Sequence, residues 1–230
     1  MPTYTKNKHS RLKYKFNGSE EINENYSQAY QDMFVLSMLD GKKNGTYLEI
    51  GSSDAKELSN TYLLDKIFGW RGISIDISSL IKNSFIEHNR RSNLIINNAL
   101  TLDYGKLLSE NNFNNQIDYL QLDIEPQHNT LNCLKLIPFD KYRFSVITYE
   151  TDLYDAKIDR EESLRNRDES RSIILSHGYE LIGGNISNTS KDDIFEDWYI
   201  DPNVINKDII KLFKKSSDFN DMAENFILNL

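Results

Sequence analysis

Short apolar runs alternate along this chain with segments whose apolar residues recur at helical spacing. The runs at 47–50, 73–76, 94–96, 119–122 and 144–149 have the length and composition of buried strands. Between them, the spacing of apolar residues predicts helices through 63–68, 80–85, 103–108 and 130–136. Strands that alternate with helices in this way predict an α/β fold built on a mostly parallel sheet.

The segments on either side of this alternation have a different pattern. Residues 1–25 are polar and basic, which indicates a flexible or partly ordered arm, and a helix is predicted from Ser27 to Gly41. After the fifth strand we expect a charged helix, closing strands at 179–182 and 195–200 with a bend at 183–185 between them, and helical segments near 209–213 and 226–227. The chain therefore divides into an arm (1–25), a main domain (26–202) and a helical extension (203–230).

The first strand and the turn after it carry the clearest chemical signal. The segment 46–54 reads Thr-Tyr-Leu-Glu-Ile-Gly-Ser-Ser-Asp, so an apolar strand stops at Gly51, which permits a tight turn and close approach of a ligand. The next strand ends in Asp76, 25 positions after Gly51. An acid at this place is typical of a nucleoside site, where it accepts hydrogen bonds from the ribose hydroxyls.

The residues of the turn indicate which nucleoside to expect. A dinucleotide site needs three glycines around the pyrophosphate, and two of the three are missing here. Glu49 and Asp54 beside the turn would repel phosphates, whereas they suit a cationic ligand such as S-adenosylmethionine. The alternative is an ordinary strand, turn and helix that binds no ligand.

Six motifs between Tyr26 and Pro202 carry a family resemblance. They are Ser27-Gln28-x-x-Gln31-Asp32, Tyr47-Leu48-Glu49-Ile50-Gly51, Ser59-Asn60-Thr61, Gly69-Trp70-x-Gly72-Ile73, Asp118-Tyr119-Leu120-x-Leu122-Asp123-Ile124-Glu125 and Phe195-Glu196-Asp197-Trp198-Tyr199. Together they resemble the FkbM family of S-adenosylmethionine-dependent methyltransferases. The resemblance implies the Rossmann-like class I methyltransferase fold, a seven-stranded mostly parallel sheet with helices on both faces, and most often O-methylation of a sugar or polyketide hydroxyl. Pro126 departs from the family, in which a glycine often follows Asp-x-Glu.

We predict the cofactor site from the strand ends and the family motifs together. Asn97, Asn98 and Ala99 fall where the third strand meets the site, so their amides could read the adenine edge. The predicted cofactor-binding residues are Gln31, Glu49, Gly51, Ser52, Ser53, Asp54, Asn60, Thr61, Asp76, Ile77, Asn98, Ala99 and Asp123.

A second group of polar residues follows the fourth and fifth strands. Asp123, Glu125 and His128 follow the fourth strand, and Glu150 and Asp152 follow the fifth. We take Asp123, Glu125, His128 and Glu150 as candidate catalytic residues, although Glu125 could instead cap a helix and His128 could be a surface residue. Crowded carboxylates are accommodated either by a divalent cation on Asp123, Glu150 and Asp152, or by protonation of one acid. Oxygen ligands favour Mg²⁺, with Mn²⁺ or Ca²⁺ as substitutes.

The sequence thus predicts an S-adenosylmethionine-dependent O-methyltransferase that acts on a sugar hydroxyl, in a nucleotide-activated sugar or a surface glycan, with help from a divalent cation. One alternative is a noncatalytic methyltransferase-like subunit of a glycan assembly complex. Another is an O-methyltransferase of a polyketide or other small molecule. An NAD-dependent oxidoreductase is disfavoured because the turn lacks the glycines.

Composition narrows the partners and the compartment. A net charge of −8 argues against general nucleic-acid binding, which depends on lysine and arginine. The single cysteine, Cys133, cannot form an internal disulfide, and no apolar run approaches the roughly 20 residues of a membrane span. The basic start lacks the apolar core of a signal peptide, so we expect a cytoplasmic protein with a small-molecule or glycan acceptor. The helical extension could cover the core or join two copies in a homo-oligomer.

Overall fold

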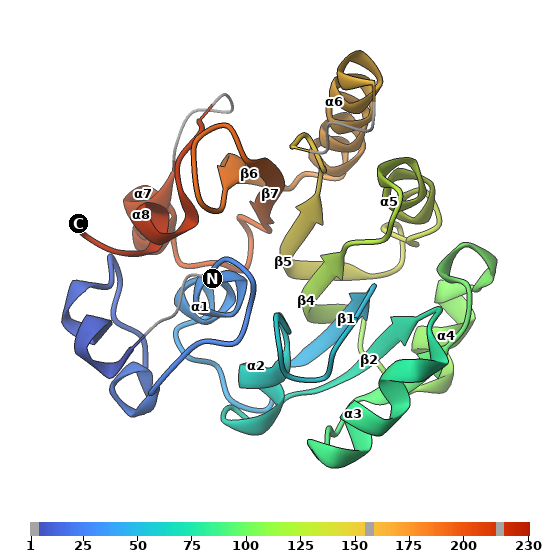
Figure 1. Ribbon diagram of the computed structural model, residues 1–230, viewed down its shortest axis with the longest axis horizontal. Coiled ribbons are helices and arrows are strands. Elements are labelled where there is room, and N and C mark those ends of the chain that lie inside the picture. Colours follow the sequence, from blue (N-terminus) through green and yellow to red (C-terminus); the bar gives the residue numbers. More distant parts are fainter. Residues whose placement is uncertain (1–4, 155–158, 215–218) are drawn as a thin grey trace.

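A computed structural model describes residues 5–154, 159–214 and 219–230, which build one seven-stranded sheet with helices on both faces (Figure 1). The strand order is β3-β2-β1-β4-β5-β7-β6. The first five strands are parallel, and β7 runs antiparallel to both β5 and β6. The strands are β1 (Thr46–Ile50), β2 (Arg71–Asp76), β3 (Asn93–Ile96), β4 (Gln116–Leu122), β5 (Arg143–Glu150), β6 (Glu180–Ser187) and β7 (Ile194–Ile200).

The register of the parallel strands brings their carboxyl ends to one edge of the sheet. Ile50 at the end of β1 pairs with Ile75 on β2 and with Leu122 on β4, and Leu122 pairs with Tyr149 on β5. In β2, β4 and β5, the residue that follows these paired positions is an acid. Asp76, Asp123 and Glu150 are therefore delivered to the same edge by the pairing itself.

Each face of the sheet is covered by its own set of helices (Figure 1). One face packs against α1 (Gln31–Met38), α2 (Tyr62–Lys66), α7 (Lys207–Phe213) and α8 (Ala223–Ile227), around Trp70 and Trp198. The other face packs against α4 (Tyr104–Glu110), α5 (Gln127–Leu134) and α6 (Arg160–Ser176). The short helix α3 (Lys82–Glu87) follows β2. None of the described helices is long and apolar enough to cross a membrane.

The two ends of the chain pack together on the α1 face. The backbone N–H of Lys13 donates to the carbonyl of Ile227 (2.9 Å), and that of Asn229 donates to the carbonyl of Arg11 (2.6 Å). Leu12, Phe16 and Ile22 are buried in the same cluster as α8. Three apolar side chains spaced through residues 5–25, the segment predicted to be a flexible or partly ordered arm, therefore anchor it to the core.

Most predicted elements have the predicted type, and three differ in detail. The helix after the fourth strand begins at Gln127, before the predicted start at residue 130. The segment 183–185 does not separate two strands but lies inside β6, where the pairing with β7 shifts register and Asn185 has a φ of 56°. Helix α1 begins at Gln31, after Tyr30 in the left-handed region (φ 66°), so Gln28 precedes the helix.

Candidate active site

A cavity of about 470 Å³ opens at the carboxyl edge of the parallel strands. Its lining comes from six separate stretches of the chain. They contribute Gln28, Gly51, Ser53, Ile75–Ile77, Asn97–Leu100, Asp123–Glu125, Asn129, Glu150 and Tyr154. Open α/β sheets bind ligands at this edge, so the cavity is the candidate active site.

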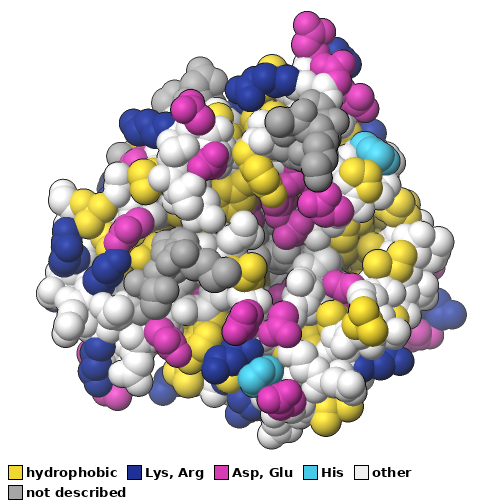
Figure 2. Space-filling model, in the orientation of Figure 1, with side chains coloured by type: hydrophobic (Ala, Val, Ile, Leu, Met, Phe, Trp, Pro, Cys, Tyr) yellow, Lys and Arg dark blue, Asp and Glu magenta, His cyan; other side chains and the backbone are white. Residues whose placement is uncertain are grey.

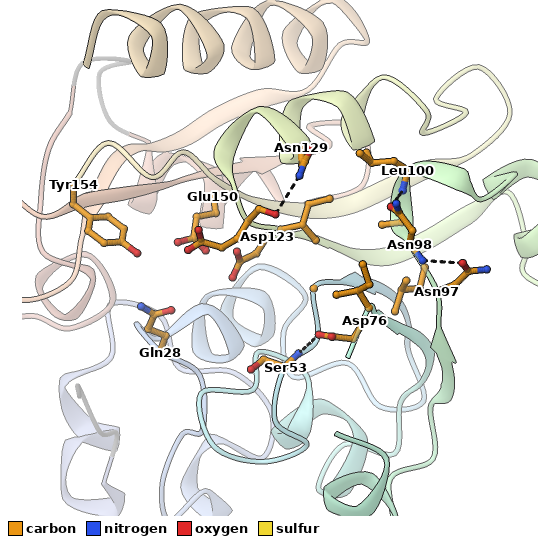
Figure 3. A pocket seen from close by; sticks show the side chains of 16 residues that line it. Gln28, Ser53, Asp76, Asn97, Asn98, Leu100, Asp123, Asn129, Glu150 and Tyr154 are labelled. Atoms are coloured by element: carbon orange, nitrogen blue, oxygen red, sulfur yellow. Dashed lines mark hydrogen bonds between the residues drawn. The ribbon is translucent and has the colours of Figure 1, made fainter. Parts of the chain in front are cut away.

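The cavity is elongated, with different chemistry at its two ends (Figure 3). Asn97, Asn98 and Leu100 lie at one end, and Gln28 and Tyr154 lie at the other. Asp123 and Glu150 point into the space between them. A ligand that fills this cavity would therefore place one end among amides and aliphatic side chains and its middle beside carboxylates.

Gly51 turns the chain from β1 into the cavity wall. It has a φ of +83°, and a Cβ atom on it would lie 1.6 Å from the carbonyl oxygen of Asp123. Glycine is therefore required by the approach of the β4 end to the β1 end, in addition to any approach by a ligand. The N–H of Asp123 donates to the carbonyl of Ile50 (3.0 Å), which fixes the same junction.

The carboxylate of Asp76 is held in one orientation by two backbone N–H groups. Ser53 donates to one oxygen (2.9 Å) and Ser78 to the other (2.7 Å). Each carboxylate oxygen can accept a second hydrogen bond, so both remain able to receive a hydroxyl group. The Ser53 contact also links the turn after β1 to the end of β2 (Figure 3). It therefore holds Ser53 and Asp76, both predicted to bind the cofactor, next to each other.

The end of the cavity at Asn97 and Asn98 combines aliphatic side chains with ordered amides. The backbone N–H of Asn98 donates to the side-chain oxygen of Asn97 (2.8 Å), and the side-chain oxygen of Asn98 accepts from the N–H of Leu100 (2.9 Å). Ile77 is 74% exposed and Leu100 contributes a second apolar surface. Apolar surfaces beside fixed amides suit a flat heteroaromatic base.

Asp123, Glu150 and Asp152 form a chain of carboxyl groups. Burial raises the pKa of Glu150 well above its usual range, and the adjacent carboxylates of Asp123 and Asp152 raise it further. Burial also raises the pKa of Asp123, while the hydrogen bond that it accepts from Glu150 acts in the opposite direction. Glu150 is therefore the protonated member and donates to Asp123. Burial and nearby acids, Glu150 first among them, raise the pKa of the Tyr154 hydroxyl.

The cavity is acidic. Its lining includes Asp76, Asp123, Glu125 and Glu150, and no Lys or Arg occurs among the lining residues that the structure describes. Figure 2 shows Asp and Glu side chains gathered near the middle of the corresponding face. Such a site attracts a cation and repels phosphate groups.

Glu49 and Thr61, two of the residues predicted to bind the cofactor, lie outside the cavity lining and bond to neighbouring elements. Glu49 is 2% exposed and accepts hydrogen bonds from Thr61 (2.7 Å) and Ser74 (2.6 Å). Arg90 donates to Thr61 (2.6 Å) and is ion-paired with buried Asp65 (2.8 Å). Glu49 and Thr61 thus hold β1, β2 and the segment before α2 together, and neither lines the cavity.

Gln31 also lies outside the cavity lining and contacts residues next to Gln28. Its side-chain oxygen accepts from the N–H of Ala29 (2.7 Å), and Asp32 accepts from the N–H of Tyr26 (2.9 Å) and the hydroxyl of Ser27 (2.7 Å). These contacts fix the segment that places Gln28 at the end of the cavity. The family motif around Gln28 is therefore split between one lining residue and two positioning residues.

The remaining predicted residues outside the lining have distinct surroundings. Asp54 accepts from the N–H groups of Lys56 and Glu57 and from the Ser84 hydroxyl, so it stabilises the turn. The Ser52 hydroxyl and the Asn60 side-chain oxygen are buried and accept or donate no hydrogen bond among the described residues. His128 is exposed on α5 and is not among the residues that line the cavity.

The described residues include no cluster of side chains that matches the predicted metal site. Within residues 5–154, 159–214 and 219–230, no group of three or more His, Cys, Asp and Glu side chains is arranged to hold a metal ion. Asp123 and Glu150 line the cavity, whereas Asp152 is buried (4% exposed) and is not among the lining residues.

The sequence interpretation missed part of the lining. The sequence predicts no role for five of the lining residues: Ile75, Leu100, Ile124, Asn129 and Tyr154. Asn129 donates to the carbonyl of Glu125 (3.2 Å) from the first turn of α5. Tyr154 lies two residues beyond Asp152, so an aromatic side chain after an acidic strand end was the available signal.

Solved structures give an independent comparison. No protein-family model and no curated protein matches this sequence. A candidate rRNA methylase from Clostridium thermocellum superimposes on 74% of this chain and 94% of its own, at 12% identity and a TM-score of 0.51. An O-methyltransferase from Bacillus cereus with S-adenosylhomocysteine covers 75% and 78%, at 13% identity and a TM-score of 0.47. TrmK from M. capricolum, with the same cofactor product, covers 76% and 69%, at 15% identity and a TM-score of 0.48.

The chain has the class I methyltransferase fold. The seven-stranded order with an antiparallel β7 confirms the fold that the family motifs implied. At these identities the likeness shows the fold, and the reaction has to be argued from the chemistry of the cavity.

Proposed function

We propose that this protein is an S-adenosylmethionine-dependent O-methyltransferase that acts on a sugar hydroxyl. The observation that carries the proposal is the acidic cavity at the carboxyl edge of a class I methyltransferase sheet, with Asp76 at the end of β2. The ligand is cationic at its sulfonium and its ammonium groups, and four carboxyl groups line the cavity without a described Lys or Arg. These carboxyl groups would repel the pyrophosphate of a ligand such as NAD.

The lining residues fit the parts of this ligand in order along the cavity. Asp76 would accept the ribose hydroxyls, since its two oxygens are already oriented by Ser53 and Ser78. Ile77, Asn98 and Ala99 would contact the adenine. Gly51 and Ser53, with Asp123, would hold the amino-acid portion near the middle. When bound, S-adenosylmethionine supplies an electrophilic methyl group with a neutral thioether as leaving group.

The carboxyl pair provides a place for the acceptor's proton. Glu150 donates to Asp123, so the pair carries one proton and Asp123 retains a basic oxygen. Asp123 would accept the proton of an acceptor hydroxyl as that hydroxyl takes the methyl group and the sulfonium S–C bond breaks. General-base assistance of this kind contributes about 10²- to 10⁴-fold to a rate. Glu125, which also lines the cavity, is a second candidate base.

The choice of oxygen and of a sugar depends on the FkbM resemblance, which goes beyond the fold. The same site could serve a polyketide hydroxyl, and a scaffolding subunit could retain the fold without turnover. A divalent cation on Asp123 and Glu150 is the remaining alternative to general-base catalysis by the pair. All of these alternatives use the same cavity. Activity measurements separate them, because they differ in the acceptor that is methylated, in whether turnover occurs at all and in whether turnover needs a cation.

The test is transfer of a labelled methyl group. Purified protein is incubated with S-adenosylmethionine labelled at the methyl group and a panel of methyl glycosides, and label is counted in the glycoside. We expect transfer to at least one glycoside, with Asp123→Asn reducing kcat by about 10²-fold or more. Cofactor binding with label in no glycoside would remove the sugar assignment, and absence of cofactor binding would remove the methyltransferase assignment.

A further inference from the structure

A second, smaller cavity adjoins the first at the end away from Asn98. It has a volume of about 190 Å³ and is lined by Gln28, Tyr154, Asn188, Thr189, Asp193 and Phe195. Gln28 and Tyr154 line both cavities, so they form the boundary between the two spaces. Asp123 and Glu150 lie on the first cavity's side of this boundary (Figure 3).

We propose that this second cavity is the acceptor subsite, that it takes one uncharged, hydroxyl-bearing ring such as a terminal sugar residue, and that Asn188 determines its specificity. The inference rests on the proposed function, because it places the acceptor next to the carboxyl pair. It adds the residues that select the acceptor, which come from the connection between β6 and β7.

The size of the cavity limits what enters it. Pockets that enclose a whole small ligand measure about 300 to 1,000 Å³. A space of about 190 Å³ is smaller than this range, so it suits one ring whose remaining substituents extend into solvent. A nucleotide or a polycyclic acceptor would not fit inside.

The polar groups of the cavity favour a hydroxyl-rich ligand. The side-chain oxygen of Asn188 is buried and accepts no hydrogen bond from any residue in the described part of the chain. A buried acceptor without a partner is unfavourable, and a hydroxyl group of a ligand would satisfy it. Thr189 donates to Asp193, and this hydrogen bond holds the pKa of Asp193 below its usual range, so an ionised acceptor also faces the cavity.

One wall of the cavity is apolar and rigid. Phe195 is 2% exposed and lies on β7 within the main core cluster. Its ring can contact the C–H face of a sugar while Asn188 and Asp193 receive hydroxyls. The connection itself is fixed, because the N–H of Ser187 donates to the carbonyl of Asp221 (3.0 Å) and the Asn220 side chain donates to the carbonyl of Lys191.

The charge of the two cavities disfavours a phosphate close to the ring. No Lys or Arg lines either cavity among the described residues, and Asp193 adds a negative charge to the second. The four arginines of α6 have other contacts: Arg171 pairs with Asp197 (2.8 Å), Arg167 with Asp168 (2.8 Å) and Arg165 with Glu161 (3.7 Å), and Arg160 donates to the carbonyl of Leu153 (3.4 Å). A sugar 1-phosphate should therefore bind less well than the corresponding neutral glycoside.

The test measures glycoside binding to the full chain saturated with S-adenosylhomocysteine. Methyl α-glycosides of glucose, galactose, mannose and rhamnose are compared, by calorimetry and saturation-transfer NMR, with the 1-phosphates of glucose, galactose and mannose. We expect at least one glycoside to bind, and each 1-phosphate to bind at least fivefold more weakly than its glycoside. Binding of no glycoside, or tighter binding of the 1-phosphates, would overturn the inference.

Two variants assign the effect to this cavity. Asn188→Leu should weaken binding of the glycoside about tenfold, because it removes the buried acceptor at nearly constant volume. Asp193→Asn should weaken it about threefold, whereas Asp192→Asn, at an exposed neighbour outside the lining, should leave it within twofold. Melting temperature and S-adenosylhomocysteine affinity should match the parent protein in all three. Unchanged glycoside affinity in a folded Asn188→Leu variant contradicts the proposal.

The failures of the two proposals can be told apart. If S-adenosylhomocysteine does not bind, the methyltransferase proposal fails, and glycoside binding that depends on Asn188 would still mark a sugar site. If S-adenosylhomocysteine binds and the glycosides do not, the methyltransferase proposal stands and the acceptor subsite is wrong.

Discussion

Glu150 donates a hydrogen bond to Asp123 where the ends of two adjacent parallel strands meet. Neither β4 nor β5 alone creates this contact. It follows from the pairing of Leu122 with Tyr149, which places the next residue of each strand at the same edge. A proton shared between two acids explains how a cavity with so many carboxyl groups avoids full like-charge repulsion.

The shared proton predicts a spectroscopic signal at neutral pH. Infrared spectra of the protein at pH 7 should contain the C=O stretch of a buried protonated carboxyl group, and Glu150→Gln should remove that component. An amide can still donate to Asp123, so the variant should retain its fold and lose less than about tenfold in kcat, compared with about 10²-fold or more for Asp123→Asn. A spectrum unchanged by Glu150→Gln, or equal losses in the two variants, would contradict the assignment.

Glu196 predicts how stability depends on pH. It is 1% exposed and accepts from the Trp198 indole, and burial raises its pKa to about 8. The folded state therefore holds a proton that the unfolded state releases above about pH 4.5. Stability should fall as the pH rises from about 4.5 to 8, by about 3 to 5 kcal/mol from this residue, and then level off.

The measurement for Glu196 is urea unfolding at pH 5, 7 and 9. Glu196→Gln keeps an oxygen for Trp198 and cannot ionise, so its stability should decline less with pH than that of the parent protein. The difference between the two proteins isolates Glu196 from other titrating groups. A parallel decline in both would show that Glu196 is ionised in the folded state at neutral pH.

Gly51 and Gly178 form a matched pair for the β1–β4 junction. Both have φ near +80°, but a Cβ atom on Gly51 would collide with the Asp123 carbonyl, whereas one on Gly178 has no atom within 4 Å. Gly178→Ala should cost about 1 kcal/mol of unfolding free energy, and Gly51→Ala more than about 4 kcal/mol or the fold itself. Similar costs, measured by thermal or urea unfolding, would contradict the close approach of the two strand ends.

Chelation tests the role of a divalent cation. If the Asp123–Glu150 pair acts by taking the proton, methyl transfer should continue at more than about half its rate after EDTA treatment and gel filtration. Mg²⁺ or Mn²⁺ added back should then have little effect. Loss of transfer with EDTA and recovery with Mg²⁺, while cofactor binding persists, would instead establish the cation predicted from the sequence.

The sequence was sufficient to predict the parts of the site that follow from strand order. Asp76, Asp123 and Glu150 end parallel strands, and the ends of neighbouring parallel strands share an edge, so their convergence needed only the strand positions. The fold class followed from the same alternation. The strand ends are therefore the part of the site that a pattern of apolar residues can locate.

The rest depended on packing that no local pattern records. Glu49 and Thr61 match a family motif, yet they bind each other beneath the cavity. Gln28 and Tyr154 reach one end of the cavity from segments far apart in the chain. His128 is an exposed residue of α5, which begins at Gln127, a boundary that the polar residues before Thr130 did not reveal.

The central claim is that the cavity binds a cationic adenosyl ligand through Asp76, and calorimetric titration tests it most directly. The protein is titrated with S-adenosylmethionine and with NAD at the same pH and salt concentration, and the titration is repeated with Asp76→Ala and with Glu110→Ala, an exposed acid on α4. We expect S-adenosylmethionine to bind and NAD not to bind. Asp76→Ala should weaken binding by about 1.5 to 3 kcal/mol, and Glu110→Ala should not change it. Binding of NAD, or unchanged S-adenosylmethionine affinity in a folded Asp76→Ala variant, would contradict the claim.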